Sequence, residues 1–401
     1  MKAAAYAQLT KAESAFVSTN SICQGRIVPL LWPRIFEIGS FIRFAYTSFK
    51  WANLASHNAG VTVSIIGLST QSSRGRQLFD INREGHVTVR DATNITPYLT
   101  IGENIVVNSL RARVSALPEM SFGNMPVDGG NLLLSSDEFK SLALTQEDER
   151  TFIRRIYGSA EFIRGIDRKC LWVTDENLPR ALLIDSLSKR IEAVKSMRLK
   201  SKDSGTNELS AKAHQFREMN CAEQHTLILP GVSSERREYL PIGLIDSQSV
   251  VSNLAFALYD APLWNMALIA SRIHLVWIAT VCGKLETRYR YSNTLGWNTF
   301  PVPLLTEQNK ADLNTCAENI LLAREAHFPA TIADLYNPEQ MPENLRHAHE
   351  RNDEVLERIY IGRRFKNDTE RLEKLFELYT KMTTAANAKP AAKATRGKKV
   401  S

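Results

Sequence analysis

Two arginines and a glutamate in the stretch KLETRYRYS, residues 284–292, have side chains suited to recognising nucleic-acid bases. The alternation of charged and aromatic residues predicts a strand, whose side chains point to opposite faces in turn. Glu286, Arg288 and Arg290 would then share one face. A guanidinium matches the O6 and N7 acceptors of guanine, and a carboxylate accepts a hydrogen bond from the cytosine amine. This chemistry suits base reading, but an exposed ladder of ion pairs on a sheet is the preferred explanation from these residues alone.

A second group of polar residues lies in SSERREY, residues 233–239. Serine hydroxyls and arginines are frequent phosphate ligands, and such contacts fix the register of a protein on DNA without reading its sequence. Ordinary loop charge is the alternative explanation. The candidate phosphate-binding residues are Ser233, Ser234, Arg236 and Arg237.

Two aromatic residues, Phe49 and Trp51, fall on one face of a predicted strand in TSFKWAN. Enzymes that modify a base extrude it from the duplex and stack it on aromatic side chains. Two aromatic residues of a hydrophobic core would show the same spacing. The pair is therefore a candidate base pocket that depends on further evidence.

Other catalytic and metal-binding patterns are missing from the sequence. It has no GxGxxG or Walker A loop, and the HAH stretch at 347–349 puts its histidines on different faces of a helix. No CxxC pair exists, so we predict neither a zinc ribbon nor a disulfide framework. The irregular cysteine spacing fits a reducing cytoplasm. The five cysteines are Cys23, Cys170, Cys221, Cys282 and Cys316.

Composition allows a polyanionic partner without requiring one. The 401 residues are 44% hydrophobic and include 50 basic and 43 acidic residues, for a net charge of +7. This sign suits DNA, and it also suits a merely soluble basic protein. The most hydrophobic stretch, residues 253–283, contains Asp260, Arg272 and His274, which are costly in lipid. We therefore expect a buried segment there and no membrane span.

The order of predicted elements indicates an α/β beginning, a mixed middle and a helical end. In residues 1–70, a helix precedes the buried strand AFVSTN, the helix VPLLWPRIF, and the strands FIRFAYTSFKW and AGVTVSIIGL, which the loop ANLASHN joins. Residues 71–304 mix strands such as HVTVRD and NIVVN with helices such as LIDSLSKRIEAVKSMRLKSK. Residues 305–382 are predicted to be helical, with Thr306 as an N-cap. The basic residues 383–401 should be a disordered tail.

Taken together, these stretches resemble the MmeI-like DNA methyltransferases, which are fused type II restriction–modification enzymes. The resemblance runs in family order from residue 1 to about residue 382. It is carried by AFVSTNSICQG, VPLLWPRIF, FAYTSFKWANLASHNAGVTVSIIGL, LPEMSFGNMPVDGGNLLLS, IYGSAEFIRGIDRKCLWV, VSSERREYLPIG, IHLVWIATVCGKLETRYRYSNTLGWNTFPVP and ADLYNPEQMPENLRHAHERNDEVLERIYIGRRF.

The resemblance implies an adenine-specific, S-adenosylmethionine-dependent enzyme that acts on double-stranded DNA. It implies that residues 1–70 are the end of a Rossmann-like methyltransferase domain, that 71–304 form an α+β target recognition domain, and that 305–382 form a helical C-terminal region. It makes Glu286 and Arg288, with Arg290, candidate base readers. It also places Phe49 and Trp51 at the family's late aromatic motif, beside the flipped adenine.

The sequence departs from the family in lacking its catalytic motifs. The Gly-rich cofactor loop and the Asn-Pro-Pro-aromatic motif are absent, and the look-alikes NITPYL (94–99) and YNPEQ (336–340) have no consecutive prolines. We therefore expect a C-terminal portion with no catalytic residue and no metal, which would not bind S-adenosylmethionine by itself. An N-terminal methyltransferase half on another chain would complete the enzyme. The alternative is a non-catalytic specificity subunit or an inactive gene fragment.

Overall fold

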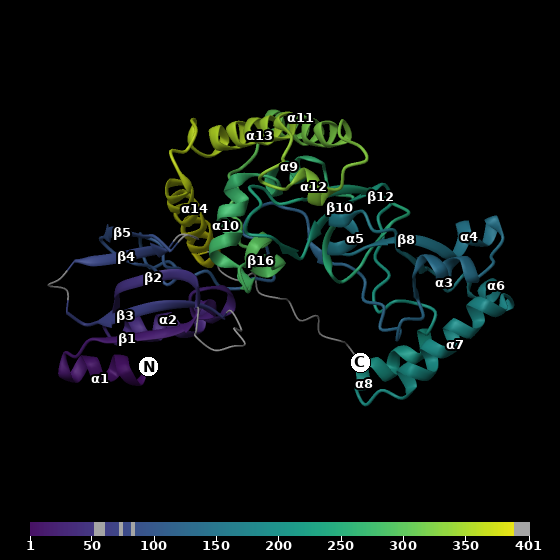
Figure 1. Cartoon of the computed structure of the whole chain (residues 1–401), viewed down its shortest axis with the longest axis horizontal. Helices are drawn as coiled ribbons and strands as arrows, with labels where there is room; N and C mark the ends of the chain where they lie inside the picture. Colours follow the sequence, from purple (N-terminus) through teal and green to yellow (C-terminus); the bar gives the residue numbers. More distant parts are fainter. Residues whose placement is uncertain (52–60, 72–74, 82–84, 389–401) are drawn as a thin grey trace, which may run out of the picture. The chain divides into compact units, whose positions relative to one another are not determined.

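The computed structural model describes residues 1–401 except 52–60, 72–74, 82–84 and 389–401. The chain forms two compact units (Figure 1). The first contains Met1–Ala116, Thr294–Leu304 and Phe365–Ser401, and the second contains Leu117–Asn293 and Leu305–Arg364. The expected loop ANLASHN and the expected tail from residue 389 onward lie outside the described residues.

The first unit is built on a five-stranded sheet with the order β1-β3-β2-β4-β5 (Figure 1). β2 and β4 are parallel, and the other neighbouring pairs are antiparallel. The sequence places a domain boundary at residue 70, but the sheet continues past it. β4 and β5 both follow residue 70, and Phe44 of β2 pairs with Gln77 of β4. The strands are β1 Ser14–Thr19, β2 Phe41–Trp51, β3 Val61–Ser69, β4 Arg76–Ile81 and β5 Val87–Ala92.

The prediction of a buried strand at AFVSTN is right about the strand and wrong about its burial. Phe16 and Val17 of β1 are 44% and 53% exposed. β1 is the edge of the sheet and pairs with β3 on one side, so its apolar side chains are covered less than those of a central strand. The helix α1, Lys2–Thr10, precedes it as expected.

The helix α2, Val28–Glu37, forms where the sequence predicts it, with Pro29 in its first turn. Its buried residues Val28, Trp32 and Ile35 recur at helical spacing. The indole Nε1 of Trp32 donates a hydrogen bond to the carbonyl of Ile22, 2.6 Å away, which ties the helix to the preceding turns.

The stretch NIVVN, residues 104–108, is not a strand. Its backbone finds other partners: the amide of Val107 donates to the hydroxyl of Tyr98 at 3.0 Å. Tyr98 in turn stacks on Phe376 of α14, Asp368–Ala388, with ring centroids 6.0 Å apart. A short apolar run therefore fits an irregular segment here, because its amides find partners other than a neighbouring strand: the amide of Ile105 donates to the carbonyl of Glu103.

α14 has the buried face that its sequence predicts, formed by Leu372, Leu375, Phe376 and Tyr379. The helix extends to Ala388, so residues 383–388, the beginning of the expected disordered tail, are helical.

The second unit contains two four-stranded sheets. One has the order β12-β10-β14-β6, and the other has the order β13-β8-β9-β7. The first set is β12 Gly243–Asp246, β10 His225–Pro230, β14 Ala255–Tyr259 and β6 Ser121–Phe122. The second set is β13 Val250–Val251, β8 Ile153–Tyr157, β9 Lys169–Leu171 and β7 Leu133–Leu134.

The hydrophobic stretch 253–283 is core structure, as predicted. It forms β14 and two buried helices, α9 Trp264–Ile269 and α10 Arg272–Val281. Among the described residues, no helix combines the length and the apolar composition that crossing a membrane requires.

A long helix, α7 Asp185–Leu199, packs Leu187, Ile191 and Val194 into the core of the second unit. Its last turn contains a fully buried arginine, Arg198, whereas Lys189 and Lys195 of the same helix are exposed. The guanidinium donates five hydrogen bonds of 2.7–2.9 Å to backbone carbonyls. These carbonyls belong to Pro126, Val127, Leu209, Lys212 and Gln215.

The helical region after residue 305 begins with α11, Glu307–Glu325, and continues with α12, Ile332–Leu335, and α13, Glu343–Ile361. Thr306 is its N-cap, as predicted, and forms a capping box with Asn309. α11 and α13 pack side by side (Figure 1). The α/β beginning, α+β middle and helical end expected from the sequence are confirmed.

Candidate nucleic-acid interface

The stretch KLETRYRYS folds as a hairpin, so the prediction of one continuous strand is wrong. β15, Gly283–Leu285, pairs antiparallel with β16, Arg288–Arg290. Glu286 and Thr287 form the two-residue connection, and Glu286 adopts a left-handed backbone with φ of 59°. Such turns usually contain glycine or asparagine, which this stretch lacks. We call residues 283–290 the arginine hairpin.

The hairpin changes which of the predicted base readers share a face. Arg288 and Arg290 are two residues apart in β16 and both are exposed, so they project from the same face. Glu286 lies at the tip, where its carboxylate is 3.2 Å from the guanidinium of Arg288. Both partners are well exposed, so solvent screens this ion pair and other partners can replace it at little cost.

The second predicted cluster lies directly beside the hairpin. β11, Val232–Ser233, pairs with β16, so Ser233 is opposite Tyr289 and Val232 is opposite Arg290. The three strands form a small sheet with the order β11-β16-β15. The structure therefore brings together two segments that are more than fifty residues apart in the chain. We call residues 233–238, which begin in β11, the serine–arginine loop.

The four candidate phosphate-binding residues of this loop have different environments. Ser233 is buried, and its hydroxyl accepts a hydrogen bond from Nη1 of Arg237 at 3.3 Å. Burial lowers the pKa of Arg237. Arg236 is exposed and forms an ion pair with Glu339, while the hydroxyl of Ser234 accepts a hydrogen bond from the Arg236 amide at 3.2 Å. The side chain of Arg236 is therefore open to solvent, whereas Arg237 stabilises the loop through its hydrogen bond with Ser233.

Lys284 is a further basic residue of the hairpin that the predicted set omits. It lies opposite Tyr289 in the ladder, and its ammonium is 6.0 Å from the centre of that ring. Burial lowers its pKa, and the charge of Glu235 opposes this shift. Lys284 lies in the same charged stretch of the sequence, but only the register of the hairpin shows that it is opposite Tyr289.

Buried hydrogen bonds of His274 and Tyr291 attach the hairpin to the core of the second unit. The Nε2 atom of His274 in α10 and the hydroxyl of Tyr291 lie 3.0 Å apart and are hydrogen-bonded. The amide of Tyr291 donates to the carbonyl of Gly231 at 2.9 Å. Burial lowers the pKa of His274 to about 3, so the imidazole is neutral near pH 7. These contacts attach the end of β16 to both α10 and the start of β11.

The predicted aromatic pair lies together on β2 in the first unit. The rings of Phe49 and Trp51 have centroids 6.2 Å apart and are inclined by 40°. Phe49 is half-buried, while Trp51 is 41% exposed, so the pair is not part of a closed core.

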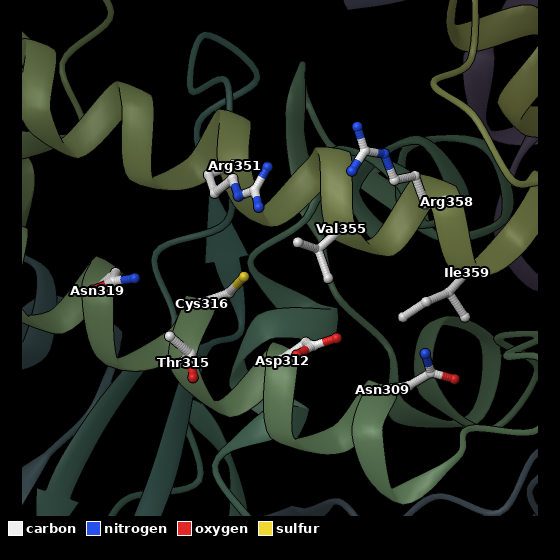
Figure 2. Close-up of a pocket in the computed structure, with 9 residues that line it drawn as sticks. All are labelled: Asn309, Asp312, Thr315, Cys316, Asn319, Arg351, Val355, Arg358 and Ile359. Carbon is white, nitrogen blue, oxygen red and sulfur yellow. The ribbon is translucent and has the colours of Figure 1, made fainter.

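A polar pocket of about 410 Å³ lies between α11 and α13 (Figure 2). Arg351 and Arg358 line it from α13, and Asp312 and Cys316 line it from α11. Glu354 pairs with both arginines, at 2.9 Å and 2.6 Å, which balances part of their charge. None of the residues that line the pocket belongs to the arginine hairpin or the serine–arginine loop.

Among the described residues, no group of three or more His, Cys, Asp or Glu side chains is arranged to hold a metal ion. The four cysteines Cys23, Cys170, Cys282 and Cys316 are buried, and all five cysteines are free. Burial raises the pKa of the Cys316 thiol to about 11, so this thiol is not a reactive nucleophile at neutral pH.

Comparison with known proteins gives one consistent result along the chain. Residues 1–80 match the model of the DNA-methyltransferase domain of MmeI, residues 101–304 match its target recognition domain, and residues 305–386 match its C-terminal domain. DNA methyltransferase A of Bacillus subtilis (strain 168) is 40% identical over 380 residues, which cover 95% of this chain and 43% of that protein.

A solved structure of the type IIL restriction–modification enzyme MmeI in complex with DNA superposes with a TM-score of 0.89 at 34% identity. The match covers 96% of this chain and 51% of the MmeI chain. The present chain therefore spans about half the length of the proteins it matches. The target recognition model alone matches half of the chain, and it includes the arginine hairpin and the serine–arginine loop. The chain belongs to the MmeI family of restriction–modification DNA methyltransferases.

Proposed function

We propose that this chain supplies sequence recognition to an adenine-specific DNA methyltransferase of a restriction–modification system. The observation that carries the proposal is the exposed pair Arg288 and Arg290, side by side on the arginine hairpin within the matched target recognition domain. A two-stranded ribbon fits the major groove of B-DNA, where guanidinium groups distinguish guanine from the other bases.

Within this proposal, the tip and the face of the hairpin read bases. Arg288 binds a guanine, and Glu286 accepts a hydrogen bond from a cytosine amine once their mutual ion pair opens. Arg290 extends the same face along the strand. The exposed ion pair keeps both side chains oriented before DNA arrives, and its exchange for base contacts costs little.

The serine–arginine loop positions the hairpin on the DNA backbone. Arg236 is the exposed guanidinium of the loop and binds a phosphate, with Ser234 beside it. Ser233 and Arg237 belong to the same phosphate site, where their mutual hydrogen bond fixes the shape of the loop. Phosphate contacts of this kind raise affinity for every sequence and set the register for base reading.

The aromatic pair on β2 is the proposed stacking surface for the extruded adenine. Trp51 offers an exposed indole and Phe49 supports it at 6.2 Å. Stacking of a base on an aromatic ring stabilises it outside the duplex.

S-adenosylmethionine is the methyl donor that we propose for the complete enzyme. The connection from β1 to α2 does not fit this cofactor, because residues 20–27, NSICQGRI, contain one glycine and no carboxylate. A nucleotide-binding connection of this type needs a Gly-rich turn and an acidic residue for the ribose. We therefore assign no cofactor contact to the described residues of this chain.

Binding-site selection tests the proposal. The purified 401-residue chain is incubated with duplexes that carry a randomised segment, and bound DNA is sequenced. We expect enrichment of one short sequence with guanine–cytosine pairs at defined positions. Retention of all sequences alike would refute a recognition role.

Methyl transfer from labelled S-adenosylmethionine to the selected duplex then separates an enzyme from a binding module. Incorporation of label into adenine would show that this chain catalyses the reaction. Sequence-selective binding without incorporation would assign the chain to specificity alone.

A further inference from the structure

The orientation of the arginine hairpin is set by α10. This helix ends at Val281, and β15 begins at Gly283, so only Cys282 separates the helix from the hairpin. The contact between His274 and Tyr291 attaches the other end of the hairpin to the same helix. A change in the direction of α10 would therefore move the hairpin with it.

Three side chains of α13 hold the junction between the end of α9 and the start of α10. Nδ1 of His349 donates to the carbonyl of Ala270 at 3.1 Å, and Nδ2 of Asn352 donates to the carbonyl of Ala267 at 2.9 Å. Oδ1 of Asp353 accepts a hydrogen bond from the amide of Arg272 at 2.7 Å. The three residues have the i, i+3, i+4 spacing that places them on one face of a helix. We call His349, Asn352 and Asp353 the α13 clamp.

The chemistry of the α13 clamp matches the two helix ends that it contacts. The last carbonyls of α9 lack partners within their helix and need donors, which the imidazole and the amide supply. The first amides of α10 need acceptors, and a negative charge is favourable at a helix N-terminus. Asp353 supplies a hydrogen-bond acceptor for the amide of Arg272 and a negative charge at this helix start, beside the N-cap Ser271.

A chain of hydrogen bonds from Arg324 through Tyr336 keeps the imidazole of His349 in its neutral form. Nδ1 of His349 donates to a carbonyl, so Nε2 accepts a hydrogen bond from the hydroxyl of Tyr336 at 2.7 Å. That hydroxyl in turn accepts one from Nε of Arg324 at 2.9 Å. Burial and the charge of Arg324 lower the pKa of His349, so the imidazole stays neutral.

Asp353 also holds the serine–arginine loop. Its Oδ2 accepts a hydrogen bond from the hydroxyl of Tyr239 at 3.1 Å, and Tyr239 directly follows the loop. The ring of Tyr239 stacks on His349, with centroids 4.1 Å apart. Burial and the charge of Asp353 raise the pKa of Tyr239, so its hydroxyl remains a donor. One carboxylate therefore joins the start of α10 to the end of the loop.

Direct contact between the clamp and DNA is excluded by burial. The exposed fractions of His349, Asn352 and Asp353 are 0%, 0% and 4%. Any influence on recognition must pass through α10 and Tyr239. The clamp lies in the segment that matches the C-terminal domain, whereas α10 and Tyr239 lie in the matched target recognition domain.

We propose that Asp353 is a positioning residue for DNA recognition, which fixes the arginine hairpin relative to Arg236. The inference rests on the proposed function and adds a role for the C-terminal region. Base reading requires the hairpin to keep its register against the phosphate contacts, and a hydrogen bond to each segment from one rigid helix supplies that register.

The test uses the 401-residue chain and three variants. Asp353→Asn removes the charge and one acceptor from the shared carboxylate, and Tyr239→Phe removes only the hydroxyl donor and keeps the ring that stacks on His349. Glu354→Gln is the matched control, since it removes a charge from the next residue of α13, which forms ion pairs with the surface arginines Arg351 and Arg358. Dissociation constants are measured for the preferred duplex found by selection and for an unrelated duplex.

We expect Asp353→Asn to reduce the preference for the selected duplex over the unrelated one by about ten-fold. Tyr239→Phe should shift the preference in the same direction. Binding to the unrelated duplex and its salt dependence should be unchanged, because Arg236 remains in place. Glu354→Gln should keep the full preference. The midpoint of urea unfolding shows that each variant is folded, and Tyr239→Phe provides the test if Asp353→Asn is not.

Two outcomes would overturn the inference while the proposed function stands. One is an undiminished preference in folded Asp353→Asn and Tyr239→Phe. The other is an equal loss of affinity for both duplexes, which indicates general destabilisation. A chain that shows no sequence preference before mutation refutes the proposed function, and the inference falls with it.

Discussion

His274 and Tyr291 form a hydrogen bond of 3.0 Å in the protein interior, which joins α10 to the end of the arginine hairpin. The imidazole is fully buried, and burial lowers its pKa to about 3. The neutral form is therefore the one that the folded structure accommodates.

The first prediction follows from this depressed pKa. In the unfolded chain the pKa of His274 is about 6.5. Between about pH 6.5 and pH 3 the unfolded state therefore binds a proton that the folded state does not bind. Stability is fully present above pH 6.5 and is lost as pH falls toward 3, by up to about 1.4 kcal/mol per pH unit. Urea unfolding at pH 7, 6 and 5 measures the loss.

The matched variant for this prediction is His274→Gln, which keeps a polar side chain and removes the titration. Its stability should fall less steeply between pH 7 and pH 5 than that of the unaltered chain. His349, whose pKa is also lowered by burial, contributes a similar slope in both proteins and cancels in the difference. Parallel pH profiles would show that His274 does not titrate in this way.

The second prediction concerns base reading by the hairpin tip. Exchange of charges in the double variant Glu286→Lys, Arg288→Asp should change which base pair is preferred at one position, with about 1–3 kcal/mol of discrimination. The two side chains are exposed, so the unfolding midpoint should not move. Binding-site selection with both proteins makes the comparison.

An exposed ion pair elsewhere in the same unit provides the control. Arg155 and Asp167 lie 3.5 Å apart with similar exposure, and the exchange Arg155→Asp, Asp167→Arg should leave the selected sequence unchanged. If the hairpin exchange also selects the original sequence, Glu286 and Arg288 do not read bases.

The third prediction separates phosphate binding from base reading. Arg236→Ala should weaken binding to all duplexes alike and lower the slope of log affinity against log salt by about 1. Titrations at several salt concentrations give both quantities. Glu339→Gln is the control, because it releases Arg236 from its ion pair and should not weaken binding. An affinity loss limited to the selected sequence would argue against a phosphate contact.

The fourth prediction tests the buried arginine of α7. Arg198→Met fills a similar volume and leaves five backbone carbonyls without their donor. We expect the second unit to lose about 3 kcal/mol or more, since unsatisfied buried acceptors are costly. Lys195→Met on the exposed side of the same helix should have little effect. Similar unfolding midpoints for the two variants would contradict this role.

Helices with a clear apolar face were predictable from the sequence. The buried positions Leu372, Leu375, Phe376 and Tyr379 recur at helical spacing, and Thr306 carries the local chemistry of an N-cap. These features depend on neighbours in the chain, so local patterns are sufficient. The order of domains required the resemblance to a family, because no periodicity encodes it.

The hairpin was not predictable from its own residues. KLETRYRYS has the alternation of a strand and no glycine, asparagine or proline to indicate a turn, yet Glu286 takes a left-handed conformation. In the folded protein β16 also pairs with β11, a segment distant in the chain, and the local sequence does not encode this pairing. Phe16 shows the related limit, since its exposure depends on the position of β1 at the edge of the sheet.

The α13 clamp was hidden for a different reason. His349, Asn352 and Asp353 lie in the polar stretch HAHERNDE, which has the composition of a solvent-facing helix surface. Their partners in the fold, which include Ala270, Ala267 and Arg272, explain their burial. The prediction that the two histidines of this stretch lie on different faces of a helix is confirmed, since His347 is exposed and His349 is buried.

The exposed end of the arginine hairpin, with Glu286 in its turn and Arg288 at the start of β16, has an evolutionary consequence. Glu286 and Arg288 are displayed on the surface, whereas Tyr291 and His274 anchor the same hairpin in the interior. Substitutions at these exposed positions remove no buried contact, so the surface chemistry can change while the fold stays the same. Under the proposed function, a change at one or two of these exposed positions alters the recognised sequence and leaves the interior of the domain as it is.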